Sequence, residues 1–344
     1  MKIEKLLRKN IAALKPYSSA RDEYTGEARV FLDANENPFN QPYNRYPDPL
    51  QREVKTKVSK LKNIDPGKVF LGNGSDEPID LLIRAFCEPG TDNIVTIDPT
   101  YGMYQVAAEI SGIELRKVPL TPDFEFDPKA LLETCNAKTK LVFLCSPNNP
   151  TGNSLGKNSI VDVLQNFGGL VIVDEAYIDF APGKTLLSDL DNYSNLVVLQ
   201  TFSKAWGMAG IRLGMAFASP EIIAVLNKIK YPYNLNILTQ QKALELLNQN
   251  EQVEEWVGLL IEEREKMAKK LQKLPFVVQV YPSDANFLLV KMYDARGIYE
   301  YLADNGIIVR DRSKVNLCDN SLRITIGSES ENKILLKALK NLIS

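Results

Sequence analysis

The sequence has 344 residues, of which 44% are hydrophobic and 24% are charged, and its formal net charge is -2. These are ordinary values for a globular protein, and 41 basic against 43 acidic side chains leave no basic surface for nucleic acid or an anionic membrane. A chain of this length exceeds what one hydrophobic core usually supports, so we expect two lobes and small-molecule ligands.

Histidine is absent from the sequence. Its absence excludes serine–histidine and cysteine–histidine triads and the commonest metal sites, so acid–base chemistry falls to lysine, tyrosine and carboxylate side chains. The four cysteines form no Cys-x-x-Cys pair, which argues against disulfides and zinc. Neither a membrane-spanning run nor the apolar core of a secretory signal is present, so we expect a cytoplasmic protein.

The first two thirds of the chain indicate an arm followed by an α/β domain. Residues 1–45 are rich in turn formers and lack periodicity, which is typical of an arm with loops. Residues 46–235 then alternate helical or loop stretches with short β-rich runs, which are KVFLG, DNIVTID, KLVFLCSP, GLVIVDEA and NLVVLQTFSK. Several of these runs are continuously apolar, as strands covered by helices on both faces tend to be.

Residues 236–344 are predicted to form a smaller α+β domain. An amphipathic helix is expected first, because apolar residues recur near helical spacing at Val253, Trp256, Leu260, Met267, Leu271 and Leu274. Four strand-like runs follow, FVVQVY, ANFLLVK, GIIVR and SLRITIG, and an amphipathic stretch ends the chain.

Polar residues follow several of the predicted strands, at the edge where an open α/β sheet binds its ligand. After the first strand, Gly74, Ser75 and Asp76 allow the backbone to approach an anion at a helix N-terminus. The same residues also suit a tight turn in which Ser75 or Asp76 caps the helix, and both interpretations stay open on this motif alone.

Asp174 ends another apolar strand, where a buried carboxylate requires a cationic partner. A protonated pyridine nitrogen is one such partner, and a structural arginine is the alternative. Tyr177 follows within reach of the same ligand, and Asn149 lies in the turn SPNNPTG, which by itself is equally well explained as structural.

The stretch TFSKAWGMAGIRLG surrounds Lys204 with small residues. A lysine that forms an imine with an aldehyde needs such an open approach. Ser203 and Arg212 in the same stretch are suited to hold a phosphate. Lys204 alone is equally consistent with a surface lysine, and the presence of all these elements in order favours a cofactor site.

In this order, the elements resemble the fold-type I pyridoxal phosphate enzymes of the aspartate aminotransferase superfamily. The motifs LDANENPF, NRYPDP, GNGSDE, PTYGMY, SPNNPTG, DEAYIDF, TFSKAWGMAGIRLG and LRITIG are together similar to the histidinol-phosphate aminotransferase family. The resemblance implies a large domain with a mixed, mostly parallel sheet between helices, a small α+β domain, and an arm that joins the small domain or a dimer contact.

The resemblance also implies site residues. Lys204 binds the cofactor aldehyde and moves a proton, Asp174 pairs with the ring nitrogen, and Tyr101 stacks on the ring. The ring oxygen is held by Asn149 and Tyr177. The cofactor phosphate is surrounded by Gly74, Ser75, Asp76, Ser203, Arg212 and, from a neighbouring subunit of a homodimer, Tyr46.

For the substrate, the resemblance implies an anion site. Arg323 matches the superfamily arginine that grips a carboxylate, and Arg310 adds a second cation that suits a phosphate dianion. Tyr17 and Asn35 complete the predicted substrate contacts, although PYSSARDEY departs from the family pattern Pro-Tyr-x-Pro-Gly at Tyr17. Alternatively, Arg310 pairs with acidic residues at the surface, at Asp311 or Glu300, and Arg312 is the functional arginine.

The activity implied is transamination between L-histidinol phosphate and 2-oxoglutarate in histidine biosynthesis, with pyridoxal 5'-phosphate as cofactor. An aromatic amino acid aminotransferase or a phosphothreonine decarboxylase could use the same cofactor residues. A transcriptional regulator of this fold would need a DNA-binding domain and basic charge, which the sequence lacks. A nucleotide-binding protein is disfavoured because neither common phosphate-loop motif is present.

Overall fold

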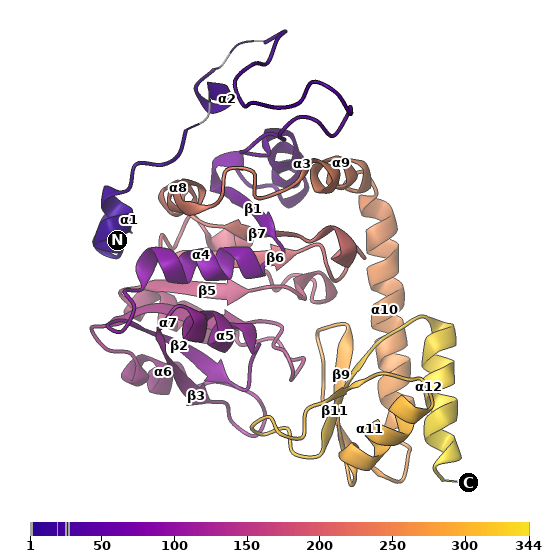
Figure 1. The fold of residues 1–344 in the computed structure, drawn as a ribbon. Helices are drawn as coiled ribbons and strands as arrows, with labels where there is room; N and C mark the ends of the chain where they lie inside the picture. The colour runs from indigo at the N-terminus through magenta and orange to yellow at the C-terminus, as the bar shows by residue number, and fades with distance from the viewer. Residues whose placement is uncertain (1–2, 19, 25, 27, 344) are drawn as a thin grey trace.

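In the computed structural model, which describes residues 3–18, 20–24, 26 and 28–343, the chain forms one seven-stranded and one four-stranded β-sheet (Figure 1). The α-helices are α1 (Lys9–Ala13), α2 (Ala20–Glu23), α3 (Arg52–Lys62), α4 (Asp76–Phe86), α5 (Met103–Ile110), α6 (Pro128–Thr134), α7 (Lys157–Asn166), α8 (Pro220–Ile229), α9 (Ile237–Leu246), α10 (Asn250–Leu271), α11 (Ala295–Asp304) and α12 (Glu329–Asn341). Short 3-10 helices are η1 (Ile3–Lys5), η2 (Pro66–Lys68), η3 (Ile178–Phe180), η4 (Leu187–Asp189) and η5 (Ala209–Ile211). None of the helices in these ranges is long and apolar enough to cross a membrane.

The large sheet is mixed and mostly parallel, as predicted. Its strands, in spatial order, are β1 (Val69–Asn73), β7 (Leu213–Phe217), β6 (Leu196–Thr201), β5 (Leu170–Asp174), β4 (Thr139–Cys145), β2 (Asn93–Asp98) and β3 (Glu114–Pro119). Strands β2 to β6 pair in parallel, whereas β7 runs antiparallel to both β1 and β6. The carboxyl ends of β4, β5 and β6 therefore meet at one edge of the sheet.

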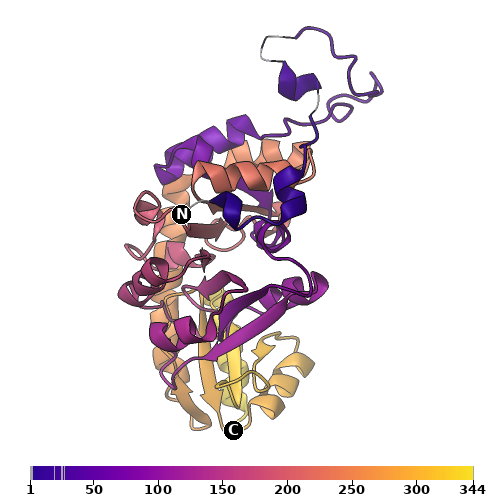
Figure 2. The ribbon, with the colours of Figure 1, turned by 90° about the vertical axis from the view of Figure 1, so that its left-hand side faces the viewer.

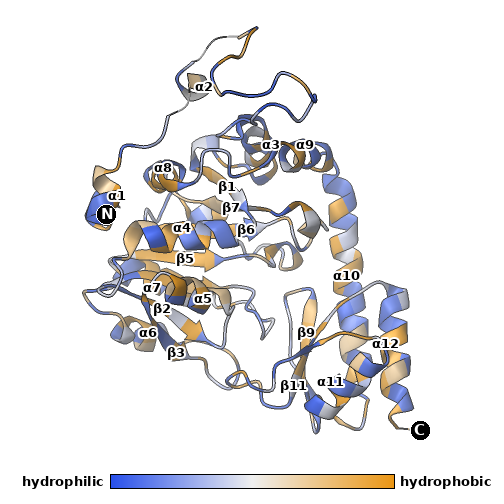
Figure 3. Ribbon diagram, in the orientation of Figure 1, coloured by the Kyte–Doolittle hydropathy of each residue, from blue (hydrophilic) through white to orange (hydrophobic). Residues whose placement is uncertain are grey.

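Helices cover both faces of this sheet. Alternate residues of a strand point to opposite faces, so Val171 belongs to the hydrophobic core shared with α3, α6, α7 and α9, whereas the adjacent Ile172 belongs to the core shared with α4, α5 and α8. Both side chains are fully buried, and Figure 3 shows the inner strands as largely hydrophobic and the outer helices as mixed. This double cover explains the continuous apolar runs of the sequence.

The small sheet is antiparallel, with the order β10 (Arg310–Asp311), β11 (Ser321–Thr325), β9 (Phe287–Met292) and β8 (Val277–Val280). Helix α10 links the two cores, because Val253 packs with the large sheet and Met267 with the small one. The prediction that Trp256 lies on the buried apolar face of this helix was wrong, because its side chain is 39% exposed. Within the buried stripe, Arg264 instead donates to the Ala285 carbonyl at 2.8 Å, a polar contact that periodicity does not reveal.

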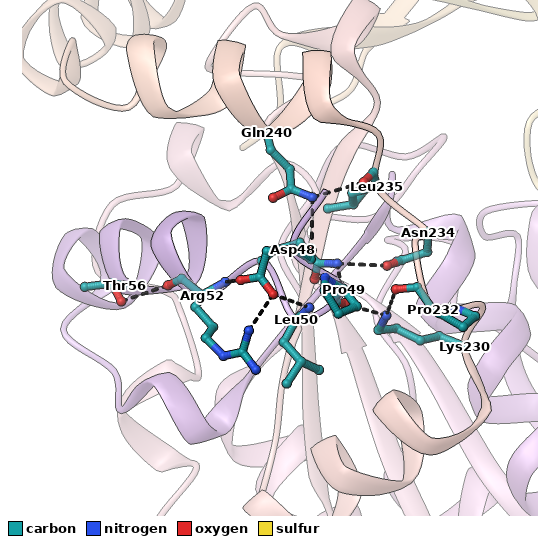
Figure 4. Close-up of polar contacts among 11 residues, drawn as sticks. Asp48, Pro49, Leu50, Arg52, Thr56, Lys230, Pro232, Asn234, Leu235 and Gln240 are labelled. Carbon is teal, nitrogen blue, oxygen red and sulfur yellow. Dashed lines mark hydrogen bonds and ion pairs between the residues drawn. The ribbon is translucent and has the colours of Figure 1, made fainter. Parts of the chain in front are cut away.

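Between α1 and α3 the chain rises away from both sheets in two perpendicular views (Figures 1 and 2). It returns along a loop that is fastened to the residue after α8 and to α9 itself (Figure 4). There the Lys230 ammonium donates to the Pro49 carbonyl at 2.7 Å, and the Gln240 amide donates to the Asp48 carbonyl at 3.3 Å. The division into an arm (1–45), a large domain (46–235) and a small domain (236–344) stays a prediction.

Candidate active site

One cavity lies where the central parallel strands end. Cys145 and Asp174 are register partners at the ends of β4 and β5, and both line it. The cavity brings together the predicted cofactor contacts of the large domain, namely Gly74, Ser75, Asp76, Tyr101, Asn149, Asp174, Tyr177, Ser203, Lys204 and Arg212. Residues from five separate loops thus converge because the sheet places those loops side by side.

Asp174 is the most deeply buried charged group of the cavity, at 2% exposure. Its carboxylate accepts hydrogen bonds from the Tyr104 hydroxyl at 2.7 Å and from the Ala176 amide at 3.1 Å. Burial raises the pKa of Asp174 to about 6, and these two donors act against that rise. Within the described residues no arginine pairs with it, so the alternative of a structural salt bridge does not apply.

The loop between β1 and α4 packs closely against the start of β7. A Cβ on Gly214 would lie 2.2 Å from the carbonyl carbon of Gly74, and Gly74 itself has a φ of +67°. The Gly74 amide donates to the Arg212 carbonyl at 2.8 Å, which fixes the loop beside that arginine. Ser75 precedes α4 without capping it through its side chain, so in the described structure its hydroxyl does not serve the alternative role of N-cap.

The acidic residue of this loop, Asp76, has two partners. It accepts a hydrogen bond from the Tyr101 hydroxyl at 3.0 Å and lies 3.6 Å from Arg212 Nη2. These contacts hold the Tyr101 side chain and the Arg212 guanidinium at the cavity. A positive group and several small residues are thereby gathered at a helix N-terminus, which suits a phosphate.

Lys204 lies in the turn after β6, and its ammonium is 5.5 Å from the centre of the Tyr177 ring. Although the side chain is solvent-accessible, the surrounding protein displaces enough water to lower the pKa of Lys204, and the charges of Arg323 and Arg212 lower it further. The carboxylate of Asp174 opposes this pKa shift. A lysine with a lowered pKa is a better nucleophile and base near neutral pH.

The small sheet approaches the cavity through Arg323 on β11, which contacts the cavity residue Asn149. Its Nη1 donates to the Asn149 side-chain oxygen at 2.6 Å, and the Asn149 amide nitrogen lies 3.5 Å from the Tyr177 hydroxyl. The Arg323 guanidinium also stands 5.3 Å from the centre of the Phe287 ring. A predicted substrate residue and two predicted cofactor residues are thus joined in one chain of contacts.

Arg310 is exposed on β10, and its proposed surface partners are engaged elsewhere. Glu300 lies 2.6 Å from Arg296, and Asp311 lies 3.6 Å from the same side chain. Among the described residues, no ion pair of Arg310 is present. Its charge therefore remains available to a ligand.

Arg312, the alternative to Arg310, is half-buried, and its Nε has no hydrogen-bond partner in the described part of the chain. Burial and the nearby charges of Arg323 and Arg310 lower the pKa of Arg312 to about 10. The three guanidinium groups are therefore close enough to repel one another, and in the described residues none of them forms an ion pair with a carboxylate.

Five predicted residues do not line the cavity of their own chain, namely Arg310, Arg323, Tyr46, Tyr17 and Asn35. Tyr46 is 50% exposed and stacks on Tyr233, with ring centres 4.4 Å apart. Tyr17 and Asn35 are exposed in the arm. Tyr46 lines a larger hollow of about 890 Å³ beneath the arm, but Lys204 does not, so we assign the chemistry to the smaller cavity.

Sequence reasoning missed two buried groups beside the cavity. Tyr104 is the second residue of α5 and lies only three residues after Tyr101, and this short separation is the sequence signal that could have linked it to the cavity. Glu175 accepts hydrogen bonds from the Leu186 amide at 2.6 Å and the Gln200 side chain at 2.9 Å. Burial raises the pKa of Glu175 to about 7.

A doubly covered mixed sheet with a lysine and a buried aspartate at its strand ends defines the class of this protein. The chain belongs to the class I and II aminotransferases, whose sequence model matches residues 23–339. A histidinol-phosphate aminotransferase of Parabacteroides distasonis is 58% identical over 340 residues, which are 99% of each chain. At this identity, the chain is a member of the histidinol-phosphate aminotransferase family.

Solved structures agree with this assignment. The histidinol-phosphate aminotransferase from Clostridium acetobutylicum superposes with a TM-score of 0.80 at 26% identity, covering 87% of this chain and 91% of its own. That from Sinorhizobium meliloti, determined in complex with pyridoxal 5'-phosphate, gives a TM-score of 0.79 at 24% identity and covers 87% and 84% of the two chains. The predicted fold class and enzyme class are confirmed.

Pyridoxal 5'-phosphate is the cofactor of this aminotransferase, as predicted. The cavity residues fit it on three counts. Asp174 is a buried carboxylate that forms no ion pair with another described residue, which suits a protonated ring nitrogen. The lowered pKa of Lys204 suits an aldehyde, and Arg212 with the Ser75 hydroxyl suits a phosphate.

Proposed function

We propose that the enzyme transfers the amino group of L-histidinol phosphate to 2-oxoglutarate, giving imidazole acetol phosphate and glutamate in histidine biosynthesis. The observation that carries this proposal is the group of Arg310, Arg312 and Arg323, which has no carboxylate partner in the described residues. Guanidinium groups bind phosphate through paired, charge-assisted hydrogen bonds. The name of the relative from Parabacteroides distasonis supports the same substrate.

In this proposal the large domain holds the cofactor. Bound pyridoxal phosphate supplies an aldehyde that bonds to amines and a ring that withdraws electrons. Asp174 keeps a proton on the ring nitrogen, Tyr101 packs against the ring, and Asn149 and Tyr177 donate to the ring oxygen. The phosphate is held by Gly74, Ser75, Asp76, Ser203 and Arg212.

Lys204 is proposed to transfer the proton of the substrate during the reaction. Its lowered pKa gives it a larger neutral fraction near pH 7 than an exposed lysine has, so its Nζ can accept a proton from the substrate carbon that bears the amino group and later return it. No histidine is needed, because one amine serves as base and then as acid.

The arginines orient the two substrates. Arg323 lies closest to the cofactor residues through its contact with Asn149, so it receives the anionic end of either substrate. Arg310 and Arg312 add the further positive charge that a phosphate dianion needs and a single carboxylate does not.

We also propose a homodimer in which the arm serves the neighbouring subunit. Leu32 is 91% exposed and Tyr17 71% exposed, and such apolar side chains gathered on one segment usually mark an interface. In the dimer, Tyr46 contacts the cofactor phosphate of the partner, and Tyr17 and Asn35 close over its substrate. We place the enzyme in the cytoplasm, where cysteines that form no disulfide remain reduced.

The test compares kcat/KM for L-histidinol phosphate with that for L-histidinol, which lacks the phosphate. We expect a loss of about 10²-fold or more without the phosphate, because the positive charges of Arg310, Arg312 and Arg323 would be left without their anionic partner. Arg312→Ala should lower this ratio of the two kcat/KM values, whereas the matched control Arg84→Ala, at a surface arginine paired with Asp80 on α4, should leave it unchanged. Equal use of both amines would show that the phosphate site is assigned wrongly.

A further inference from the structure

Tyr104, near the start of α5, is a phenol buried beneath the floor of the cavity. It is fully buried, and its hydroxyl donates to Asp174 Oδ2 at 2.7 Å. Its ring stacks on Phe143 with centres 4.9 Å apart and meets the Tyr101 ring edge-on at 5.6 Å. Tyr104 does not itself line the cavity, whereas both Asp174 and Tyr101 do.

Packing alone does not account for a hydroxyl at this position. Phenylalanine would fill the same volume without the free-energy cost of burying a polar group. The bond to Asp174 offsets that cost, and the carboxylate still has lone pairs for a ligand. The donors to Asp174 in the described structure are the Tyr104 hydroxyl and the Ala176 amide, which leave its remaining acceptor capacity to a ligand in the cavity.

We propose that Tyr104 is a positioning residue that aims the Asp174 carboxylate at the cavity and keeps it ionised for the ring nitrogen of the cofactor. This inference rests on the proposed role of Asp174. A hydrogen bond to the charged form of a carboxylate stabilises that form, whereas the complete burial of Asp174 raises its pKa and favours the neutral form. The hydrogen bond from Tyr104 therefore opposes the rise in the pKa of Asp174 that burial causes.

Tyr104 can act as a donor at every pH at which the enzyme works. Burial and the neighbouring Asp174 charge raise the pKa of Tyr104 well above its usual value, so the phenol keeps its proton. Loss of this donor would make the carboxylate more basic. The proton shared between Asp174 and the ring nitrogen would then move toward Asp174, and the ring would withdraw electrons less strongly.

The test uses holoenzyme loaded with pyridoxal phosphate that carries ¹⁵N in the ring. In the wild type we expect the chemical shift of a protonated ring nitrogen. In Tyr104→Phe we expect a move toward the neutral value and a cofactor affinity about tenfold lower or more. The control is Thr96→Val, which removes another buried hydroxyl of the same sheet, bonded to the Phe143 carbonyl at 2.9 Å, and should leave the nitrogen signal unchanged.

A double-variant cycle separates this inference from the proposed function. Asp174→Asn alone should change the ring-nitrogen signal, and adding Tyr104→Phe should then change it no further. If Asp174→Asn has no effect, the role of Asp174 fails and this inference with it. If Asp174→Asn acts but Tyr104→Phe does not, or if Tyr104→Phe acts equally in both backgrounds, only the inference about Tyr104 is overturned.

A second variant covers the case in which Tyr104→Phe does not fold. Fluorotyrosine at position 104 keeps the ring shape and makes the hydroxyl a stronger donor. We expect it to retain the ring proton at least as fully as the wild type does, with no loss of cofactor affinity. A shift toward the neutral ring nitrogen would overturn the inference.

Discussion

The cavity at the strand ends and the N-terminal arm are built in opposite ways. In the cavity, polar side chains find partners within the chain, as Asp174 does with Tyr104 and Asn149 with Arg323. In the arm, Leu32 and Tyr17 point largely into solvent, and the backbone rises away from both sheets (Figure 2). The difference teaches that one chain can preorganise a cofactor site, whereas we infer that the arm acquires its contacts from a second chain.

The substitution with the largest expected effect lies in the cavity and tests whether the cavity carries the chemistry. Lys204→Ala should lower kcat by more than about 10⁴-fold, because it removes both the nucleophile and the proton carrier. The variant should still bind pyridoxal phosphate through Asp174 and Arg212. Borohydride reduction followed by mass spectrometry checks the attachment, and specific labelling at another lysine would remove Lys204 from its assigned role.

Arg323→Ala probes the contact between the two domains. We expect kcat/KM for L-histidinol phosphate to fall about 10²-fold or more, because a charge-assisted contact to the substrate is lost. Cofactor retention after gel filtration should stay close to that of the wild type. The control is again Arg84→Ala, and unchanged kcat/KM in Arg323→Ala would exclude a role in substrate binding.

Glu175→Gln tests whether the buried carboxyl group of Glu175, next to the cavity residue Asp174, holds a proton in the folded protein. Because burial raises the pKa of Glu175 from 4.5 to about 7, the folded protein holds a proton that the unfolded chain has already lost in this range. The stabilisation from Glu175 is complete below about pH 4.5 and is lost as the pH rises through 7. The variant should therefore gain about 1–3 kcal/mol relative to the wild type between pH 5 and pH 8.

Urea unfolding of the cofactor-free proteins at several pH values measures this gain. The control is Glu255→Gln on the exposed face of α10, which should show no pH-dependent difference from the wild type. A pH-independent difference for Glu175→Gln would mean that Glu175 stays ionised in the folded protein.

The smallest expected effect lies in the arm. Tyr17→Phe should raise KM for L-histidinol phosphate about fivefold to tenfold, because it deletes one neutral hydrogen bond, with little change in kcat or in the free energy of unfolding. Steady-state kinetics at fixed 2-oxoglutarate concentration check this. A large loss of stability would show instead that the arm is part of the folded core.

The sequence predicted the parts of the fold that local pattern determines. Strands β4, β5 and β6 were found because both of their faces are buried. Strand β3 was missed because it lies at the sheet edge, where Glu114, Arg116 and Lys117 interrupt any apolar run. Strand β7 was missed because its five residues directly follow a glycine-rich turn that lacks strand character.

The cavity was predictable to the extent that its residues follow strands. Lys204, Asp174 and Asn149 stand at such positions, so their convergence follows from a parallel sheet. Tyr104 was not assigned from sequence, and Arg312 was named only as the alternative to Arg310, because their relation to the site depends on how α5 and the small sheet pack. That packing arises from contacts distant in the sequence, which no local spacing reveals.

The measurement that tests the central claim most directly is a single half-reaction without a keto acid. The pyridoxal form of the enzyme is mixed separately with L-histidinol phosphate, L-phenylalanine and L-phosphothreonine, and its visible absorbance is followed. We predict rapid loss of the absorbance with L-histidinol phosphate at low concentration and slow loss with the other two. Equal or faster loss with L-phenylalanine, or release of carbon dioxide from L-phosphothreonine, would contradict the proposed substrate.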